Sequence, residues 1–214
     1  MTDQIHLLIT TAAADDPQTL VDGCKGLADA RLAPLTVIST TEAQNQATTD
    51  EGFAVVAHPQ ISNKDEFAQL LFAVETLKAE APQPADIYLV VPAAALEKLN
   101  YEDLRACRTI FWHDWVDVAA FGRPIFEEAA KNNPMNIKIA ASQNHRVLYV
   151  SRAGVPYGAD VMVVDTNIRA YRASALRHLA ETEPSPLERT EKIALLRGIE
   201  AGLGVYLSLI TPTA

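Results

Sequence analysis

A short aromatic and acidic segment near the middle of the chain contains residue types that metal binding or acid–base chemistry would need. It has the sequence FWHDWVD and covers residues 111–117. On an extended strand, His113 and Asp117 would point to one face and Asp114 to the other. A histidine and a carboxylate on one face can bind a metal ion or exchange protons, but the sequence offers no third ligand nearby. Two interpretations stay open: a functional pair, or polar residues that pair locally at a strand end.

A second segment, Pro184–Arg197, predicts a helix start. Ser185 can cap the first free N–H groups, Pro186 stands where a helix loses no hydrogen bond, and Glu188 completes a capping box. Apolar residues follow at helical spacing, so this helix must pack on another element. They are Leu195, Leu196, Ile199 and Leu203.

Several short motifs in the C-terminal half occur in a fixed order. They are Ser151-Arg152, Val155-Pro156-Tyr157, Ile168-Arg169-Ala170-Tyr171-Arg172 and Pro184–Arg197. Together they resemble the 3-deoxy-manno-octulosonate (KDO) cytidylyltransferases, which make CMP-KDO for lipopolysaccharide and capsule. That family has Phe-Ser-Arg, Ile-Pro-Trp, Ile-Tyr-x-Tyr-Arg and Pro-Ser-Pro-Leu-Glu in the same order, and the resemblance covers residues 117–209 but is faint before them. It implies a three-layer α/β/α fold of the nucleotide-diphospho-sugar transferase type, Rossmann-like and GT-A-like, with a mixed sheet and a small dimerisation lobe.

The resemblance also implies candidate substrate-binding residues. Arg152 matches an arginine that lies near the sugar carboxylate in the family, and a guanidinium can hold a carboxylate through two parallel hydrogen bonds. It could equally be a structural arginine paired with a neighbouring acid. Glu188 and Glu191 are retained as well, although the capping box alone explains Glu188. In the alignment, Arg169 falls near the position of a family tyrosine and Asp165 near that of a family histidine. The resemblance therefore implies a sugar pocket with changed chemistry.

The nucleotide-binding half departs from the family. In the family, the first βα loop carries two arginines and a lysine that hold the triphosphate. In this chain, an ungapped alignment puts Ala12, Pro17 and Val21 at those three positions. Asp16 is a good N-cap for a helix from Pro17 and would fill the helix end that could receive an anion.

The candidates that remain for the nucleotide are few. They are Thr10 at the strand end, Ser62 from a serine-containing family loop in which Glu66 replaces an arginine, and Lys25. Lys25 could be a displaced phosphate contact or a solvated helix lysine.

The magnesium-binding features of the family are missing too. After the strand that ends at Val91 the chain continues with Pro92-Ala93-Ala94-Ala95, where the family has a metal-binding aspartate. A later metal-binding aspartate of the family lies beyond Ala214, and a family Glu-Gln pair aligns with Ala194 and Leu195. We therefore predict no catalytic residue and no cofactor, with Mg²⁺ needed only if the chain is active.

Composition limits the other function classes. The chain of 214 residues is 49% hydrophobic, which predicts one domain, with a degenerate nucleotide-binding half over residues 1–110 and a sugar-binding and dimerisation half over residues 111–214. The net charge of -9 argues against nucleic-acid and membrane partners. Cys24 and Cys107 lack metal-ligand spacing, and the N-terminal sequence lacks an export signal. We expect a cytoplasmic protein with buried, reduced cysteines.

Alternating strand and helix patterns predict a mostly parallel sheet covered by helices. The expected strands are 5–10, 35–39, 53–57, 86–91, 109–120, 136–140, 146–150, 161–172 and 205–210. The expected helices are 17–31, a helix capped by Ser62 or Asn63 with the apolar stripe Phe67, Leu70, Leu71, Val74 and Leu77, and helices over 96–106, 124–132 and from 186 onward.

These observations favour a catalytically inactive relative that acts as a binding or regulatory subunit, with an acidic sugar or a protein as its partner. A diverged but active cytidylyltransferase is the alternative, and it would have to lower the reaction barrier by about 8 kcal/mol or more without the usual cations. Because the family enzymes are homodimers joined through the C-terminal half, we also expect a homodimer, with Val161–Val164 or the helix after Ser185 at its interface.

Overall fold

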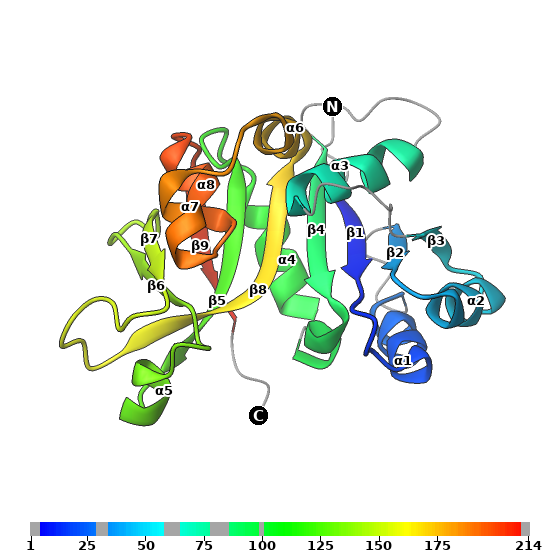
Figure 1. The fold of residues 1–214 in the computed structure, drawn as a ribbon, viewed down its shortest axis with the longest axis horizontal. Coiled ribbons are helices and arrows are strands. Elements are labelled where there is room, and N and C mark those ends of the chain that lie inside the picture. Colours follow the sequence, from blue (N-terminus) through cyan, green and yellow to red (C-terminus); the bar gives the residue numbers. More distant parts are fainter. Residues whose placement is uncertain (1–4, 29–33, 58–64, 78–85, 99–100, 211–214) are drawn as a thin grey trace.

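The computed structural model describes residues 5–28, 34–57, 65–77, 86–98 and 101–210, and within them a nine-stranded mixed sheet carries helices on both faces (Figure 1). The sheet order is β3-β2-β1-β4-β8-β5-β9, while β6 pairs with β7 and β8 outside this path. The strands are β1 (Ile5–Thr10), β2 (Leu35–Ser39), β3 (Ala54–Ala57), β4 (Ile87–Pro92), β5 (Val118–Ile125), β6 (Lys138–Ala141), β7 (Val147–Ser151), β8 (Met162–Arg172) and β9 (Val205–Leu209).

Strand residues alternate between two cores, one on each face of the sheet. In β1, Leu8 packs into the core under α3 (Glu66–Leu77) and α6 (Ala173–Glu181), whereas Leu7 and Ile9 pack into the opposite core. Such alternation is expected of strands buried on both sides. The predicted three-layer α/β/α fold is confirmed.

The helices divide between the two faces. On the front face of Figure 1 lie α3, α6, α7 (Pro186–Glu191) and α8 (Leu195–Glu200). The back face carries α1 (Pro17–Ala28), the 3₁₀ helix η1 (Ala93–Lys98) and α4 (Tyr101–Ile110), and α2 (Glu42–Asp50) packs beside α1. At the left of Figure 1 the short α5 (Glu128–Asn132), β6, β7 and the first part of β8 form a projecting lobe, residues 126–164.

The predicted strand over 109–120 is wrong. Helix α4 continues to Ile110, turns cover residues 111–115, and β5 begins only at Val118. The guanidinium group of Arg172 donates to the carbonyl oxygens of Phe111 and Val116, each at 2.8 Å. Because a side chain satisfies these carbonyl groups, the connection does not need a neighbouring strand.

Other differences concern helices. The segment 184–197 holds two short helices, because Lys192 adopts a left-handed conformation with φ 59° that ends α7. Strand β5 extends to Ile125 and leaves only a short α5 where a helix over 124–132 was expected, and the helix expected over 96–106 is divided between η1 and α4. Neither α2 nor α6 was anticipated.

The other expected strands are present, with ends within two residues of those predicted. Helix α1 begins at Pro17 as predicted, and its expected end at residue 31 lies outside the described residues. Helix α3 begins at Glu66, and Asp65 caps it by accepting hydrogen bonds from the N–H groups of Phe67 and Ala68, so the expected start at Ser62 or Asn63 is wrong. Cys24 and Cys107 are buried and unpaired, and burial raises the pKa of Cys24 to about 11 and that of Cys107 to about 12. Among the described helices, none has the length and apolar character that crossing a bilayer requires.

Candidate functional site

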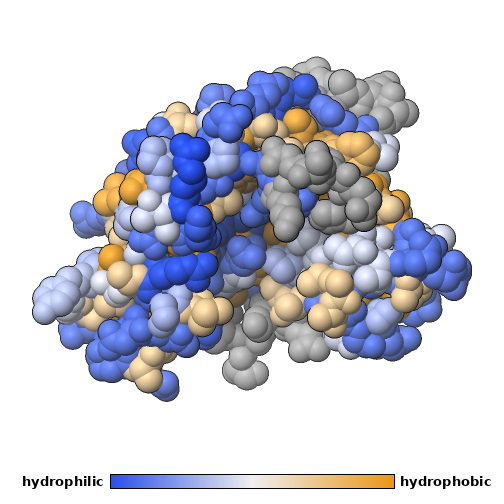
Figure 2. All heavy atoms as spheres, in the orientation of Figure 1, coloured by the Kyte–Doolittle hydropathy of each residue, from blue (hydrophilic) through white to orange (hydrophobic). Residues whose placement is uncertain are grey.

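A cleft opens at the carboxyl ends of β1 and β4, where ligands bind in many α/β sheets. It consists of a cavity of about 220 Å³ beside these strand ends and a cavity of about 440 Å³ beside the lobe. Both cavities are lined by Glu66, Asn167 and Arg169, so they are adjacent, and we treat them as two parts of one cleft. Figure 2 shows this hollow in the middle of the front face, with strongly hydrophilic side chains along its left side. We call its two parts the strand end and the lobe end.

Arg152, the residue expected on the sugar side, lines the lobe end of the cleft. Its Nε donates to the carbonyl oxygen of Glu191 at 3.1 Å and its guanidinium to that of Pro134 at 3.2 Å. Neither partner is charged, so the positive charge of Arg152 has no carboxylate in direct contact among the described residues. Lys192 lines the same part of the cleft. Arg152 and Lys192 therefore contribute cations to the lobe end that have no ion pair among the described residues, while Glu66 lines the same cavity.

Glu191 fixes the position of Arg152. Its carboxylate accepts hydrogen bonds from the Ser151 hydroxyl at 2.7 Å, the Arg152 N–H at 3.1 Å and the Tyr149 hydroxyl at 3.2 Å. Burial acts to raise the pKa of Glu191, but these hydrogen bonds outweigh it, so the pKa lies below its usual value. Glu191 thus joins α7 to β7 and supports the cleft wall.

Arg169 and Asp165 form a buried ion pair at the centre of the cleft. One guanidinium nitrogen of Arg169 donates to Asp165 at 2.5 Å and a second contacts its other carboxylate oxygen. The charge of Arg169 is therefore neutralised by its own neighbour in the strand. Glu66 faces this pair, and although much of its side chain is exposed, loss of water raises its pKa against the opposing effect of Arg169.

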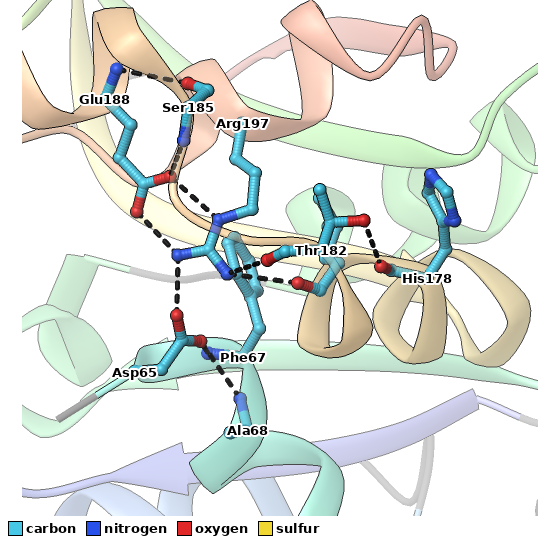
Figure 3. A network of polar contacts seen from close by, with 9 residues as sticks. Asp65, Phe67, Ala68, His178, Thr182, Ser185, Glu188 and Arg197 are labelled. Carbon is cyan, nitrogen blue, oxygen red and sulfur yellow. Dashed lines mark hydrogen bonds and ion pairs between the residues drawn. The ribbon is translucent and has the colours of Figure 1, made fainter. Parts of the chain in front are cut away.

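Glu188 belongs to a structural network beside the cleft (Figure 3). Its carboxylate binds Arg197 through two contacts of 2.7 Å and also accepts the Ser185 N–H, which confirms the predicted capping box. Arg197 in turn binds Asp65, the cap of α3, at 2.6 Å. Glu188 is absent from the residues that line the cleft, so its retained identity is explained by this network.

At the strand end, a glutamine side chain fills the loop after β1. Gln44 is fully buried, and its amide oxygen accepts hydrogen bonds from the Thr11 hydroxyl and the Thr40 N–H. Its amide nitrogen donates to the carbonyl oxygens of Ala12 at 2.8 Å and Asp15 at 3.0 Å. Gln44 was not among the predicted site residues, yet Thr41-x-x-Gln44 is a capping-box signature, and both of its hydrogen bonds form.

The residues proposed for the nucleotide have different surroundings. Thr10 lines the strand end of the cleft, whereas Lys25 lies outside the lining and pairs with Glu51 at 2.8 Å on the surface. Ser62 lies outside the described residues. Asp16 accepts the Thr19 N–H at 2.8 Å, so the predicted cap of α1 is confirmed, and this hydrogen bond lowers the pKa of Asp16.

Among the described residues, the end of β4 offers no side-chain ligand for Mg²⁺. No cluster of three or more histidine, cysteine, aspartate or glutamate side chains in these ranges could hold a metal ion. Strand β4 ends at Pro92 and continues into the alanines of η1, which offer no side-chain oxygen.

The segment 111–117 does not form the one-faced arrangement of a strand. The imidazole of His113 stacks on the indole of Trp115 with 4.5 Å between ring centroids. Asp117 accepts the Gly204 N–H at 2.7 Å, and Asp114 is exposed. The pairing of His113 with Asp117 on one strand face is therefore wrong.

Comparison with known proteins supports the resemblance. The chain is 39% identical over 99 residues to the 3-deoxy-manno-octulosonate cytidylyltransferase of Brucella anthropi. This match covers 44% of this chain and 40% of that protein. The enzyme of Mesorhizobium japonicum is 37% identical over 99 residues, with 44% and 41% covered. The match thus spans about two fifths of the length of these curated relatives. No protein-family model matches the chain.

Solved structures show the fold over a longer range. A CMP:2-keto-3-deoxy-manno-octonic acid synthetase complexed with CTP superposes with a TM-score of 0.82 at 17% identity, over 97% of this chain and 90% of that one. A putative glucose-1-phosphate thymidylyltransferase from Bacillus anthracis gives a TM-score of 0.62 at 10% identity, over 98% and 88% of the two chains. The chain is therefore similar in sequence to the 3-deoxy-manno-octulosonate cytidylyltransferases over 99 residues, and it shares its Rossmann-like fold with a CMP:2-keto-3-deoxy-manno-octonic acid synthetase.

Proposed function

We propose that this CMP-KDO synthetase-like protein binds an acidic sugar without transferring CMP to it. The observation that carries the proposal is the division of charge along the cleft. At the lobe end Arg152 and Lys192 leave positive charge open to a ligand, while at the strand end Gln44 fills the loop and Asp16 caps the helix. A carboxylate is favoured at the first end, and a triphosphate finds few cations at the second.

The size of the lobe end agrees with a sugar acid. Its cavity of about 440 Å³ lies within the range of small-molecule sites. Arg152 and Lys192 can bind a carboxylate there, and the exposed amide of Asn167 can bind sugar hydroxyl groups. No cofactor is part of this proposal.

Calorimetric titration tests the proposal with KDO and with CTP plus Mg²⁺ as separate ligands. We expect heat from KDO binding and none from CTP. Arg152→Met should weaken KDO binding by about tenfold or more, because a charged hydrogen bond contributes about 1.5–3 kcal/mol. Arg189→Met is the matched control, since Arg189 is exposed and absent from the lining of the cleft. If KDO gives no heat, or if Arg152→Met binds it as well as the unaltered protein, the proposal is wrong.

A diverged active cytidylyltransferase is the second candidate, and the 39% identity to a curated enzyme favours it. In this case Glu66, Arg169 and Asp165 would be the charged groups nearest the reacting phosphate, and Mg²⁺ would be required. Pyrophosphate release from CTP in the presence of KDO and Mg²⁺ decides between the two. Release above that of a Glu66→Gln variant would establish activity and overturn the non-catalytic proposal.

A further inference from the structure

A second cavity, of about 660 Å³, lies on the back face, between α4 and the edge strand β9. We call it the edge pocket. None of its described lining residues also lines the cleft, so ligand binding here can be tested separately from the function proposed above. Its lining consists of Ala106, Thr109, Ile110, His113, Trp115, Val116, Asn144, His145, Tyr206, Leu207, Ser208 and Leu209.

One wall of the edge pocket is a stripe of α4 and the turn that follows it. Ala106, Thr109, Ile110 and His113 stand three and four residues apart, so they lie on one side of the helix. The neighbouring Cys107 points into the core. Because alanine and threonine are small, the stripe leaves a space against the sheet edge.

The other wall is held in place by the turn between β6 and β7. Leu207 donates its N–H to the carbonyl oxygen of His145 at 2.8 Å, and Arg146 forms a bridge with Tyr206. His145 adopts a left-handed backbone conformation with φ 66°, which histidine tolerates better than most residues. These contacts fix Asn144 and His145 beside β9, so this wall is formed before any ligand binds.

The chemistry of the lining selects an uncharged ligand. Among its described lining residues there is no aspartate, glutamate, lysine or arginine, and the polar groups are two imidazoles, an amide, hydroxyls and the indole N–H of Trp115. A charged ligand would lose water without gaining an opposite charge. Trp115 is 61% exposed, and with His113 stacked on it, it offers a rigid aromatic surface for a planar ring.

We propose that the edge pocket binds an uncharged aromatic molecule, whose ring packs against Trp115 and the apolar wall of Ile110 and Leu209. Its hydrogen-bonding groups meet Asn144 and His145 at the other side. The cavity volume lies within the range of small-molecule sites, and apolar walls with a few converging polar groups are typical of them.

The uncharged dye N-phenyl-1-naphthylamine tests this proposal, because its fluorescence rises in apolar surroundings. The chain has two tryptophans, and Trp112 does not line the edge pocket, so Trp112→Phe leaves Trp115 as the single tryptophan reporter. We expect saturable dye fluorescence together with quenching of Trp115 emission. The anionic dye 8-anilinonaphthalene-1-sulfonate should bind at least about tenfold more weakly, which corresponds to about 1.4 kcal/mol.

Two variants test the location. Ala106→Phe fills the edge pocket from the partly exposed side of α4 and should abolish dye binding, while Ala129→Phe, on the exposed side of α5, should not. Trp115→Ala should weaken binding, with circular dichroism used to verify folding. Absence of a saturable signal, or binding that survives Ala106→Phe, overturns the proposal. Loss of the signal in Leu148→Ser instead would place the dye on the lobe and overturn it as well.

Discussion

Arg197, like Gln44 at the strand end of the cleft, is a buried polar side chain that connects segments far apart in the sequence. Arg197 is 3% exposed and bonds to Asp65, to Glu188 and to the carbonyl oxygens of Leu179 and Thr182. Its guanidinium also lies 4.8 Å from the centre of the Phe67 ring. Because one cation satisfies groups from α3, α6 and α7, it fixes the start of α3 and so the position of Glu66 in the cleft.

Removal of this cation should be costly. In Arg197→Met, Asp65 and Glu188 would remain with side-chain exposures of 8% and 13% and no cation between them. We expect the free energy of unfolding in urea to fall by about 3–5 kcal/mol. Arg177→Met is the control, because Arg177 pairs with Glu75 at 3.7 Å on the surface and should change stability by less than about 0.5 kcal/mol. Equal effects of the two substitutions would contradict the role given to Arg197.

The lowered pKa of Glu191 predicts a pH dependence of stability. A carboxyl group whose pKa is lower in the folded state than in the unfolded state stabilises the protein above its unfolded pKa of about 4.3. This contribution is lost as the pH falls through the lower, folded pKa. Glu191→Gln should therefore reduce unfolding free energy at neutral pH, and the difference from the unaltered protein should shrink in acid.

Urea unfolding at neutral pH and on the acid side of the unfolded pKa measures this effect. Glu183→Gln is the matched control, because Glu183 is exposed, and it should show no such trend. A difference between Glu191→Gln and the unaltered protein that stays constant with pH would show that the hydrogen bonds of Glu191 do not depend on its charge.

At the scale of elements, Gly204 determines how β9 joins the sheet. A Cβ atom at this position would lie 1.8 Å from the carbonyl oxygen of Trp115. The Gly204 carbonyl accepts the N–H groups of Asp117 and Val118, and its own N–H donates to the Asp117 carboxylate. The two segments therefore approach more closely than any other residue type allows, and this contact sets the register of β5 against β9.

Gly204→Ala should lower the free energy of unfolding by about 1–3 kcal/mol, because backbone atoms must move apart to admit the methyl group. Gly26→Ala offers a control of opposite sign, since Gly26 lies in α1 with nothing within 4 Å of an added Cβ. Alanine there should stabilise the protein by about 0.5–1 kcal/mol. Urea midpoints measure both, and an unchanged midpoint for Gly204→Ala would show that the contact can relax.

Local signals predicted much of the fold. The alternation and apolar runs of β1, β2 and β4 and the capping box at Ser185 are properties of neighbouring residues, and they were predicted correctly. The connection over 111–117 was not, because its turns depend on Arg172, more than fifty residues away in the chain. The same holds for the cleft. The motif around Arg152 was enough to name it as a candidate residue of the cleft, whereas the position of Gln44 in the loop after β1 depends on tertiary contacts that the sequence does not show.

At the scale of the molecule, large apolar side chains are exposed on the projecting lobe. Phe126, Met135, Leu148, Tyr157 and Val161 are 66%, 78%, 57%, 101% and 45% exposed. Exposed apolar groups of this size mark interaction surfaces in many soluble proteins. Of the residues first expected at a dimer interface, Met162 and Val164 are buried at 6% and 5% and are not available for it. The exposed part of the lobe is the better candidate for a symmetric, self-complementary contact.

We therefore predict a homodimer formed through the lobe. Sedimentation velocity at micromolar concentration should give twice the chain mass of 23.3 kDa. Leu148→Glu would place a charge within the exposed apolar surface of the lobe and, because this charge would be desolvated without a partner in the dimer, should shift the protein to the monomer. Phe72→Glu is the matched control, since Phe72 is 44% exposed on α3, outside the lobe, and should leave the dimer intact. A monomeric unaltered protein, or a Leu148→Glu variant that remains dimeric, would remove the lobe from consideration as the interface.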